Sequence, residues 1–189
     1  MKKQIFKEIL LSFSALAAAG TLSAQPVESL PYWKDVDVVA VNKQIPRTAF
    51  MTFGSRDAAL GGKCDDSEWD RSVYGTWKFY YVDACGKLPA DICDPARPLD
   101  GWHDITVPGN WELQGFGTPV YVNHGFDFCP RNPVPPLLPE ANPVGVYRRD
   151  FEVPELWAGR DLFLQLAAAK SGVYVYVNGR EVGYSEDSK

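Results

Sequence analysis

The most informative stretch of the sequence is Val173-Tyr-Val-Tyr-Val-Asn-Gly-Arg-Glu-Val-Gly-Tyr184. Runs of β-branched and aromatic residues, which are typical of strands, lie on either side of Asn178-Gly179. An Asn-Gly pair suits a type I′ turn, because both central residues of that turn need a positive φ. The pattern predicts a β-hairpin in which residues 173–177 and 180–184 run antiparallel.

Four further runs of strand length precede this hairpin. Each is short, rich in apolar or aromatic residues, and bounded by Gly, Pro or other turn-forming and small residues. They are Trp77–Val82, Ile105–Val107, Val146–Val153 and Asp161–Leu166. After residue 24, no segment has apolar residues at helical spacing over three turns. The sequence therefore predicts an all-β fold, an antiparallel β-sandwich.

The composition supports one folded domain behind an N-terminal leader. The chain is 46% hydrophobic and 23% charged, which supplies enough apolar material for a buried core. Three lysines lead into the apolar run Ile9–Ala19, and small residues follow up to Ala24, which is the plan of a secretory signal peptide over residues 1–24. The apolar run is about half as long as a bilayer crossing requires. We therefore expect export to the periplasm or the extracellular space, with no membrane span.

Charge and residue spacing exclude two classes of partner. Removal of the leader takes away three lysines and one glutamate, which changes the formal net charge from −5 to −7. Because an acidic chain without a basic patch repels phosphates, nucleic acid is not an expected partner. A zinc site needs close Cys pairs with matching His, and the sequence has neither. The only histidines, His103 and His124, have no Ser, Cys or Asp partner at a recognisable spacing.

The chain has four cysteines, which are Cys64, Cys85, Cys93 and Cys129. An exported chain permits disulfides, and four cysteines allow three pairings. The sequence leaves these pairings open, and the favoured interpretation joins Cys85 to Cys93.

Six short phrases follow one another between Tyr74 and Lys189. They are Tyr74-Gly-Thr-Trp-Lys-Phe79, Val107-Pro-Gly-Asn-Trp111, Pro119-Val-Tyr-Val-Asn123, Asn142-Pro-Val-Gly-Val-Tyr147, Val177-Asn-Gly-Arg180 and Val182-Gly-Tyr-Ser-Glu-Asp-Ser-Lys189. One such phrase alone is common, because Asn, Gly and Pro form turns in every β protein. Six in this order resemble the N-terminal region of bacterial glycoside hydrolases of family 2, of the β-galactosidase type.

The resemblance implies a jelly-roll sandwich of the galactose-binding-like type, spanning residues 74–189 and truncated at its C-terminal end. Residues 25–73 would form an arm and loop in front of it. In a full-length enzyme of this family, a (β/α)₈ barrel follows, and two Glu residues of that barrel carry out retaining hydrolysis of terminal β-galactosides. Such a barrel takes about 250 residues. We therefore expect no catalytic residue in this chain and no activity from it alone.

The resemblance also implies two substrate-binding residues, Asn123 and Asp187. An ionised carboxylate accepts hydrogen bonds from sugar hydroxyls, and an amide both donates and accepts, so the two can fix the orientation of a sugar ring. The Asp187 counterpart also touches a monovalent cation in some family members. No cofactor is expected in this fragment, whereas sodium and magnesium are expected for a full-length enzyme, which would bind a β-galactoside or oligosaccharide and could form a homo-oligomer.

Several alternatives stay open from the sequence. The chain could be a stand-alone carbohydrate-binding module, or a fragment of a family 2 β-glucuronidase or β-mannosidase. Asn123 could only cap a turn, and Asp187 could be a solvated residue. Three aromatic residues, Trp77, Trp111 and Tyr147, resemble sugar-stacking platforms, but the hypothesis that they form core is favoured for such strands.

Overall fold

The structure is a computed structural model, and it describes residues 32–48, 50–63, 66–119, 129, 132–134, 137–139 and 141–186. Internal contacts divide the chain into two compact units. The described residues of the first unit fall within Ile45–Tyr74 and Asp150–Gln165. Those of the second, called the sheet unit below, fall within Leu22–Gln44, Gly75–Arg149 and Leu166–Lys189.

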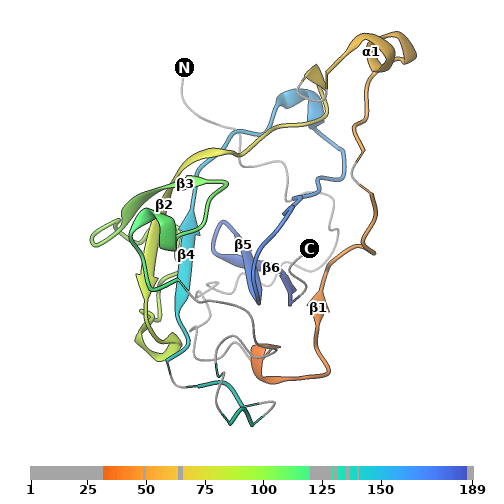
Figure 1. The fold of residues 1–189 in the computed structure, drawn as a ribbon. Coiled ribbons are helices and arrows are strands. Elements are labelled where there is room, and N and C mark those ends of the chain that lie inside the picture. Colours follow the sequence, from red (N-terminus) through yellow and green to blue (C-terminus); the bar gives the residue numbers. More distant parts are fainter. Residues whose placement is uncertain are drawn as a thin grey trace, which may run out of the picture. The chain divides into compact units, whose positions relative to one another are not determined.

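Sheet B of the sheet unit has three antiparallel strands in the order β3-β2-β4 (Figure 1). Its central strand is β2 (Gly75–Val82), with β3 (His103–Val107) and β4 (Val144–Arg148) on either side. In the register, Phe79 of β2 lies opposite both His103 and Tyr147. The predicted strands at 77–82 and 105–107 are confirmed, each extended by two residues at its start.

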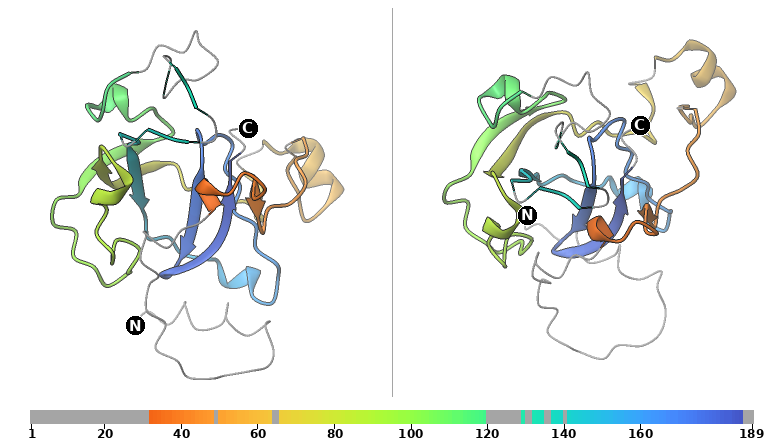
Figure 2. Two further views of the ribbon diagram at one scale, coloured as in Figure 1. Left: turned by 90° about the horizontal axis from the view of Figure 1, so that it is seen from below. Right: turned by 60° about the horizontal axis from the view of Figure 1, so that its bottom comes forward.

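Sheet A has the order β1-β6-β5 and contains the predicted hairpin. Its strands are β1 (Ala40–Val41), β5 (Val173–Val177) and β6 (Arg180–Ser185). Asn178 and Gly179 have φ values of 52° and 79°, as a type I′ turn requires, so the hairpin prediction is confirmed. Both views of Figure 2 show the β5–β6 hairpin beside β1. The segment expected to be an arm therefore supplies one strand of this sheet.

The two sheets share a hydrophobic cluster centred on Ile92, which is 3% exposed. Tyr80 and Val146 of sheet B and Tyr174 and Tyr176 of sheet A pack against it. A core with side chains from two antiparallel sheets is the arrangement of a β-sandwich. The all-β prediction is confirmed.

A second cluster of aromatic side chains surrounds Phe79, which is fully buried. Its ring centroid lies 4.7 Å from those of Phe116 and Tyr147 and 5.9 Å from that of Trp111. Gly145 of β4 leaves the space that the Trp111 ring occupies. Three of the six phrases seen in the sequence therefore meet at one buried phenylalanine.

Within the part of the chain that the structure describes, helical structure is confined to short pieces. The described residues contain one α-helix, α1 (Arg56–Gly61), in a segment that the sequence indicated as a loop. The Ser55 side chain caps it by accepting from the Ala58 N–H at 3.2 Å. The remaining pieces are 3₁₀ turns: η2 (Tyr32–Lys34), η4 (Cys85–Lys87), η5 (Glu112–Gln114) and η6 (Glu155–Trp157). No helix in the described ranges is long and apolar enough to span a membrane.

Two strand predictions need correction. Residues 161–166 form no strand, and Phe163 within them is 65% exposed. A strand requires a neighbour that accepts its backbone hydrogen bonds, and none of the described strands pairs with this segment. The strand predicted at 146–153 runs instead from Val144 to Arg148, where its pairing with Lys78 of β2 ends.

The described residues of the first unit form no sheet and are held together by polar and aromatic contacts. The indole N–H of Trp157 donates to the Glu68 carbonyl at 2.8 Å, and the Arg160 guanidinium lies 4.1 Å from the centroid of the Trp69 ring. The Ser67 hydroxyl is buried and donates to the Thr52 carbonyl.

Candidate functional site

Both residues predicted to bind substrate, Asn123 and Asp187, lie outside the described residues. The structure does describe the elements that lead to them. Strand β6 and Glu186 precede Asp187, and a turn over residues 108–117 precedes the segment that contains Asn123. Strand β6 with Glu186 and the turn over residues 108–117 are therefore the parts of the candidate site whose geometry is known.

The end of β6 is fixed by a buried tyrosine. Tyr184 is 2% exposed, and its hydroxyl donates to the Glu186 carboxylate at 2.5 Å. The Glu186 N–H donates to the Val39 carbonyl at 3.0 Å. The residue immediately before Asp187 is thus bound through both its backbone and its side chain.

Two residues that follow β1 in the chain form hydrogen bonds with strand β6. The Asn42 side-chain amide donates to the Val182 carbonyl at 2.7 Å, and the Lys43 ammonium donates to the Ser185 hydroxyl at 3.0 Å. The Tyr32 ring lies 5.2 Å from that of Tyr184, measured between centroids. These contacts explain how a strand as short as β1 keeps its place in sheet A.

Burial raises the pKa values of two tyrosines in sheet A. Burial raises the pKa of Tyr174 to about 12, and Glu181 acts in the same direction. Burial first, and then the hydrogen bond to Glu186, raises the pKa of Tyr184. Both phenols therefore keep the proton with which they can donate a hydrogen bond to a higher pH than an ordinary tyrosine does.

The turn before the Asn123 segment is held against sheet B. Gln114 of η5 accepts from the Thr106 N–H at 2.7 Å and donates to the Thr106 carbonyl at 3.0 Å. Trp111 and Phe116, on either side of Gln114 in the chain, pack on Phe79. Three side chains from one turn thus attach it to two strands.

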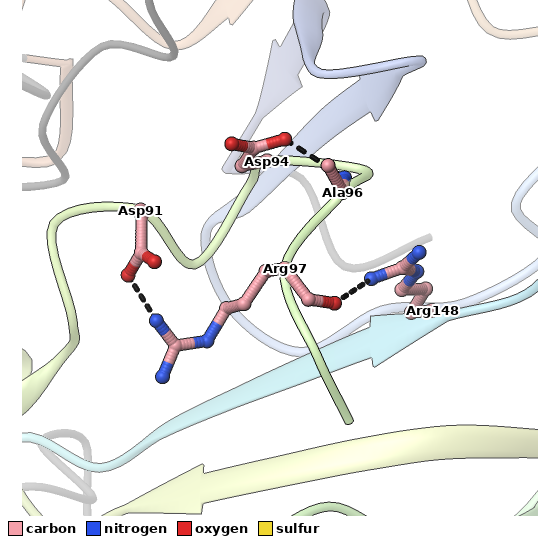
Figure 3. A network of polar contacts seen from close by, with 5 residues as sticks. All are labelled: Asp91, Asp94, Ala96, Arg97 and Arg148. Carbon is pink, nitrogen blue, oxygen red and sulfur yellow. Dashed lines mark hydrogen bonds and ion pairs between the residues drawn. The ribbon is translucent and has the colours of Figure 1, made fainter. Parts of the chain in front are cut away.

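A cluster of arginines and aspartates ties residues 91–97 to β4, and Figure 3 shows most of it. The Arg148 guanidinium donates to the Arg97 carbonyl at 3.0 Å and to the Pro95 carbonyl. The Arg97 guanidinium forms an ion pair with the Asp91 carboxylate. The Asp94 carboxylate accepts a hydrogen bond from the Ala96 N–H. This segment carries Ile92, so the cluster supports the core between the sheets.

We expect Arg148→Lys to lower the free energy of unfolding by about 1–2 kcal/mol. A lysine ammonium lacks the planar fork with which the guanidinium reaches both carbonyls, so one of them loses its donor. Urea denaturation followed by tryptophan fluorescence measures the change. The exposed Arg180→Lys is the control, expected within about 0.5 kcal/mol of the parent. Equal losses of unfolding free energy in both variants would contradict a stabilising role for the two hydrogen bonds of the Arg148 guanidinium.

The aromatic candidates pack against other aromatic side chains. Trp111 and Tyr147 contact Phe79, and the Trp77 ring meets Tyr147 edge-on with centroids 6.4 Å apart. Tyr147 is 38% exposed, so its ring is only partly covered. Trp111 thus packs on the buried Phe79 as the core interpretation expects, whereas Tyr147, although its ring also contacts Phe79, is exposed and does not belong to the buried core.

The favoured disulfide is not formed. Cys85 and Cys93 are both thiols, packed against Ile92. Burial raises the pKa of Cys93, against the opposing effect of a hydrogen bond from Tyr176, so the thiol stays protonated near neutral pH. Cys64 lies outside the described residues.

No group of three His, Cys, Asp or Glu side chains that could hold a metal ion occurs within the described ranges. His103 packs against Phe116, with ring centroids 5.3 Å apart, which is a structural contact. The predicted cation contact of Asp187 and the second histidine, His124, both lie outside these ranges.

The fold and the ordered phrases define an antiparallel β-sandwich domain. Residues 71–189 match the family described as "Glycosyl hydrolases family 2, sugar binding domain". This match covers more than half of the chain, so the chain belongs to that family, and the resemblance seen in the sequence is confirmed.

Among curated proteins, the chain is similar to bacterial β-galactosidases. That of Psychromonas ingrahamii is 32% identical over 157 residues, covering 83% of this chain and 15% of the relative. That of Halalkalibacterium halodurans is 33% identical over 162 residues, covering 85% and 16%. Beta-galactosidase 2 of Enterobacter cloacae is 35% identical over 163 residues, covering 83% and 15%. The chain thus spans about one sixth of the length of these relatives.

Proposed function

We propose that this chain is the sugar-binding part of an exported β-galactosidase, which hydrolyses terminal β-galactosides with retention of configuration. The observation that carries the proposal is the match of residues 71–189 to the sugar-binding domain family. The names of the similar proteins support the choice of galactoside. The buried cluster around Phe79, to which three of the family-like phrases contribute, accounts physically for their co-occurrence.

In this proposal the chain contributes binding groups and no catalytic ones. Asp187 accepts hydrogen bonds from two adjacent sugar hydroxyls, and Asn123 donates and accepts at another position of the ring. The two carboxyl groups of retaining hydrolysis, about 5 Å apart, come from a barrel outside this chain. Asp187 also contacts a monovalent cation such as sodium, and magnesium binds elsewhere in the enzyme.

The activity is tested with the complete gene product on nitrophenyl β-galactoside, β-glucuronide and β-mannoside. We expect the galactoside to be turned over fastest. Greater turnover of either other glycoside would assign the protein to that enzyme class instead. Residues 25–189 alone are expected to hydrolyse none of the three. Millimolar binding of galactose or lactose by this fragment, measured by calorimetry, would favour a stand-alone binding module.

Asp187→Ala in the complete gene product is expected to lower kcat/KM for the galactoside roughly ten- to a hundredfold, because hydrogen bonds to a charged acceptor are worth about 1.5–3 kcal/mol. The exposed Asp100→Ala is the matched control and should leave kcat/KM unchanged. If the two variants behave alike, Asp187 does not bind substrate.

Export is tested separately, on protein recovered from the periplasm or the medium. N-terminal sequencing should begin at Gln25, directly after the small residues that end the leader. A chain that stays in the cytoplasm and keeps Met1 would refute export without affecting the proposed sugar specificity.

A further inference from the structure

Among the strands that the structure describes, β3 lies at the edge of sheet B, because the strand order is β3-β2-β4. Along an antiparallel strand, the N–H and C=O of one residue point to the same side, and the side alternates from residue to residue. Both groups of Thr106 bind Gln114, so they point away from β2. Thr106 is thus one of the places along β3 where a further strand could join the sheet.

The Gln114 side chain occupies this place. A carboxamide presents one carbonyl and one N–H group side by side, as the backbone of a neighbouring strand would. Its oxygen accepts from the Thr106 N–H at 2.7 Å, and its nitrogen donates to the Thr106 carbonyl at 3.0 Å. We infer that Gln114 substitutes for a neighbouring strand at the outer edge of β3 and prevents this edge from pairing with a second copy of the chain.

The backbone around Gln114 is shaped for this contact. A Cβ atom at Gly109 would lie 2.8 Å from the Gln114 side-chain nitrogen and 2.9 Å from the Thr106 carbonyl oxygen, so only glycine leaves room for the pair. The N–H groups of Gln114 and Phe116 both donate to the Trp111 carbonyl, at 2.9 and 3.1 Å. The backbone of the turn therefore positions the Gln114 carboxamide without help from a partner chain.

Two neighbouring features protect the same edge. Asp104 of β3 forms an exposed ion pair with Lys78 at 2.6 Å, and Pro108, directly after the strand, has no N–H to offer. Charges and prolines are common means of keeping edge strands from pairing. Thr106 lies between them, and its peptide groups are the ones that Gln114 covers. Without that cover, two identical edges could pair about a two-fold axis, which makes a second copy the expected partner.

The test uses Gln114→Leu and Gln114→Glu in the full 189-residue chain. Leucine removes both hydrogen bonds, so exchange of the Thr106 amide, followed by NMR, should be roughly tenfold faster. Sedimentation velocity should then show dimers that increase with concentration. Glutamate keeps an acceptor for the Thr106 N–H, loses the donor to the Thr106 carbonyl and places a charge on the edge, so this variant should remain monomeric. The matched control is the exposed Gln44→Leu, which should change neither measurement.

Three results would overturn the inference. One is unchanged exchange at Thr106 in Gln114→Leu, and another is faster exchange in that same variant without self-association. If the leucine variant does not fold, the parent protein decides, since a Thr106 amide that exchanges at the rate of an unstructured peptide could not be covered by Gln114. Gly109→Ala gives a further measurement, because it should displace the amide and raise the exchange rate while Gly86→Ala does not.

Discussion

Replacement of Phe79 by alanine is expected to lower the free energy of unfolding by about 3–5 kcal/mol. The side chain is fully buried, and aromatic rings from a neighbouring strand and from the 108–117 turn surround it. These rings are anchored to separate parts of the chain, so they cannot collapse freely into the space that alanine leaves. Since domains of this kind are stable by only about 5–15 kcal/mol, the variant should be close to unfolding at 37 °C.

Urea denaturation with linear extrapolation measures this loss. Phe163→Ala makes the same chemical change at a side chain that is 65% exposed, and it should cost less than about 0.5 kcal/mol. A Phe79→Ala variant as stable as Phe163→Ala would show that the ring cluster is not the core of sheet B.

Replacement of Gly145 by valine is expected to destabilise the protein by about 3 kcal/mol, for the opposite reason. A Cβ at this position of β4 would overlap the Trp111 ring and lie 2.6 Å from Cε2 of Phe79. Neither ring can withdraw, because Phe79 is buried and Trp111 belongs to the turn that Gln114 holds. Overpacking therefore has to move the strand or the turn.

The control for Gly145 is Gly86→Ala, because a Cβ at Gly86 meets nothing within 4 Å. Its stability should stay within about 0.5 kcal/mol of the parent. A double-mutant cycle of Gly145→Ala with Trp111→Leu gives a second check, since the smaller side chain should offset part of the loss. If the two substitutions were additive, the proposed overlap with Trp111 would be incorrect.

Local chemistry accounts for the elements that the sequence predicted correctly. The β5–β6 hairpin follows from Asn178-Gly179, whose positive φ values need no tertiary contact. Strands β2 and β3 were recognised because aromatic or β-branched residues stand between turn formers. The helix α1 was missed because its six residues are too few to show a period, although Ser55 at its N-cap was a usable signal.

The segment at 161–166 shows where such patterns fail. Its apolar residues suit a strand, but a strand exists only if another backbone pairs with it, and pairing is a property of the fold rather than of the segment. The same holds for Gln114, which reads as an ordinary polar residue until the fold places Thr106 beside it. The two substrate-binding residues, Asn123 and Asp187, came from the family-like phrases and stay predictions.

The sequence by itself determined the all-β class and the hairpin, because these follow from residue types at short spacing, and the order of its six phrases indicated the family by resemblance. Only the tertiary structure decided which strands are neighbours, that Gly145 makes room for Trp111, and that Gln114 covers the edge of β3. The physical reason is the separation along the chain over which each interaction acts. Turn and strand preferences act over a few residues, whereas ring packing and edge pairing join groups that are distant along the chain and leave no local signature.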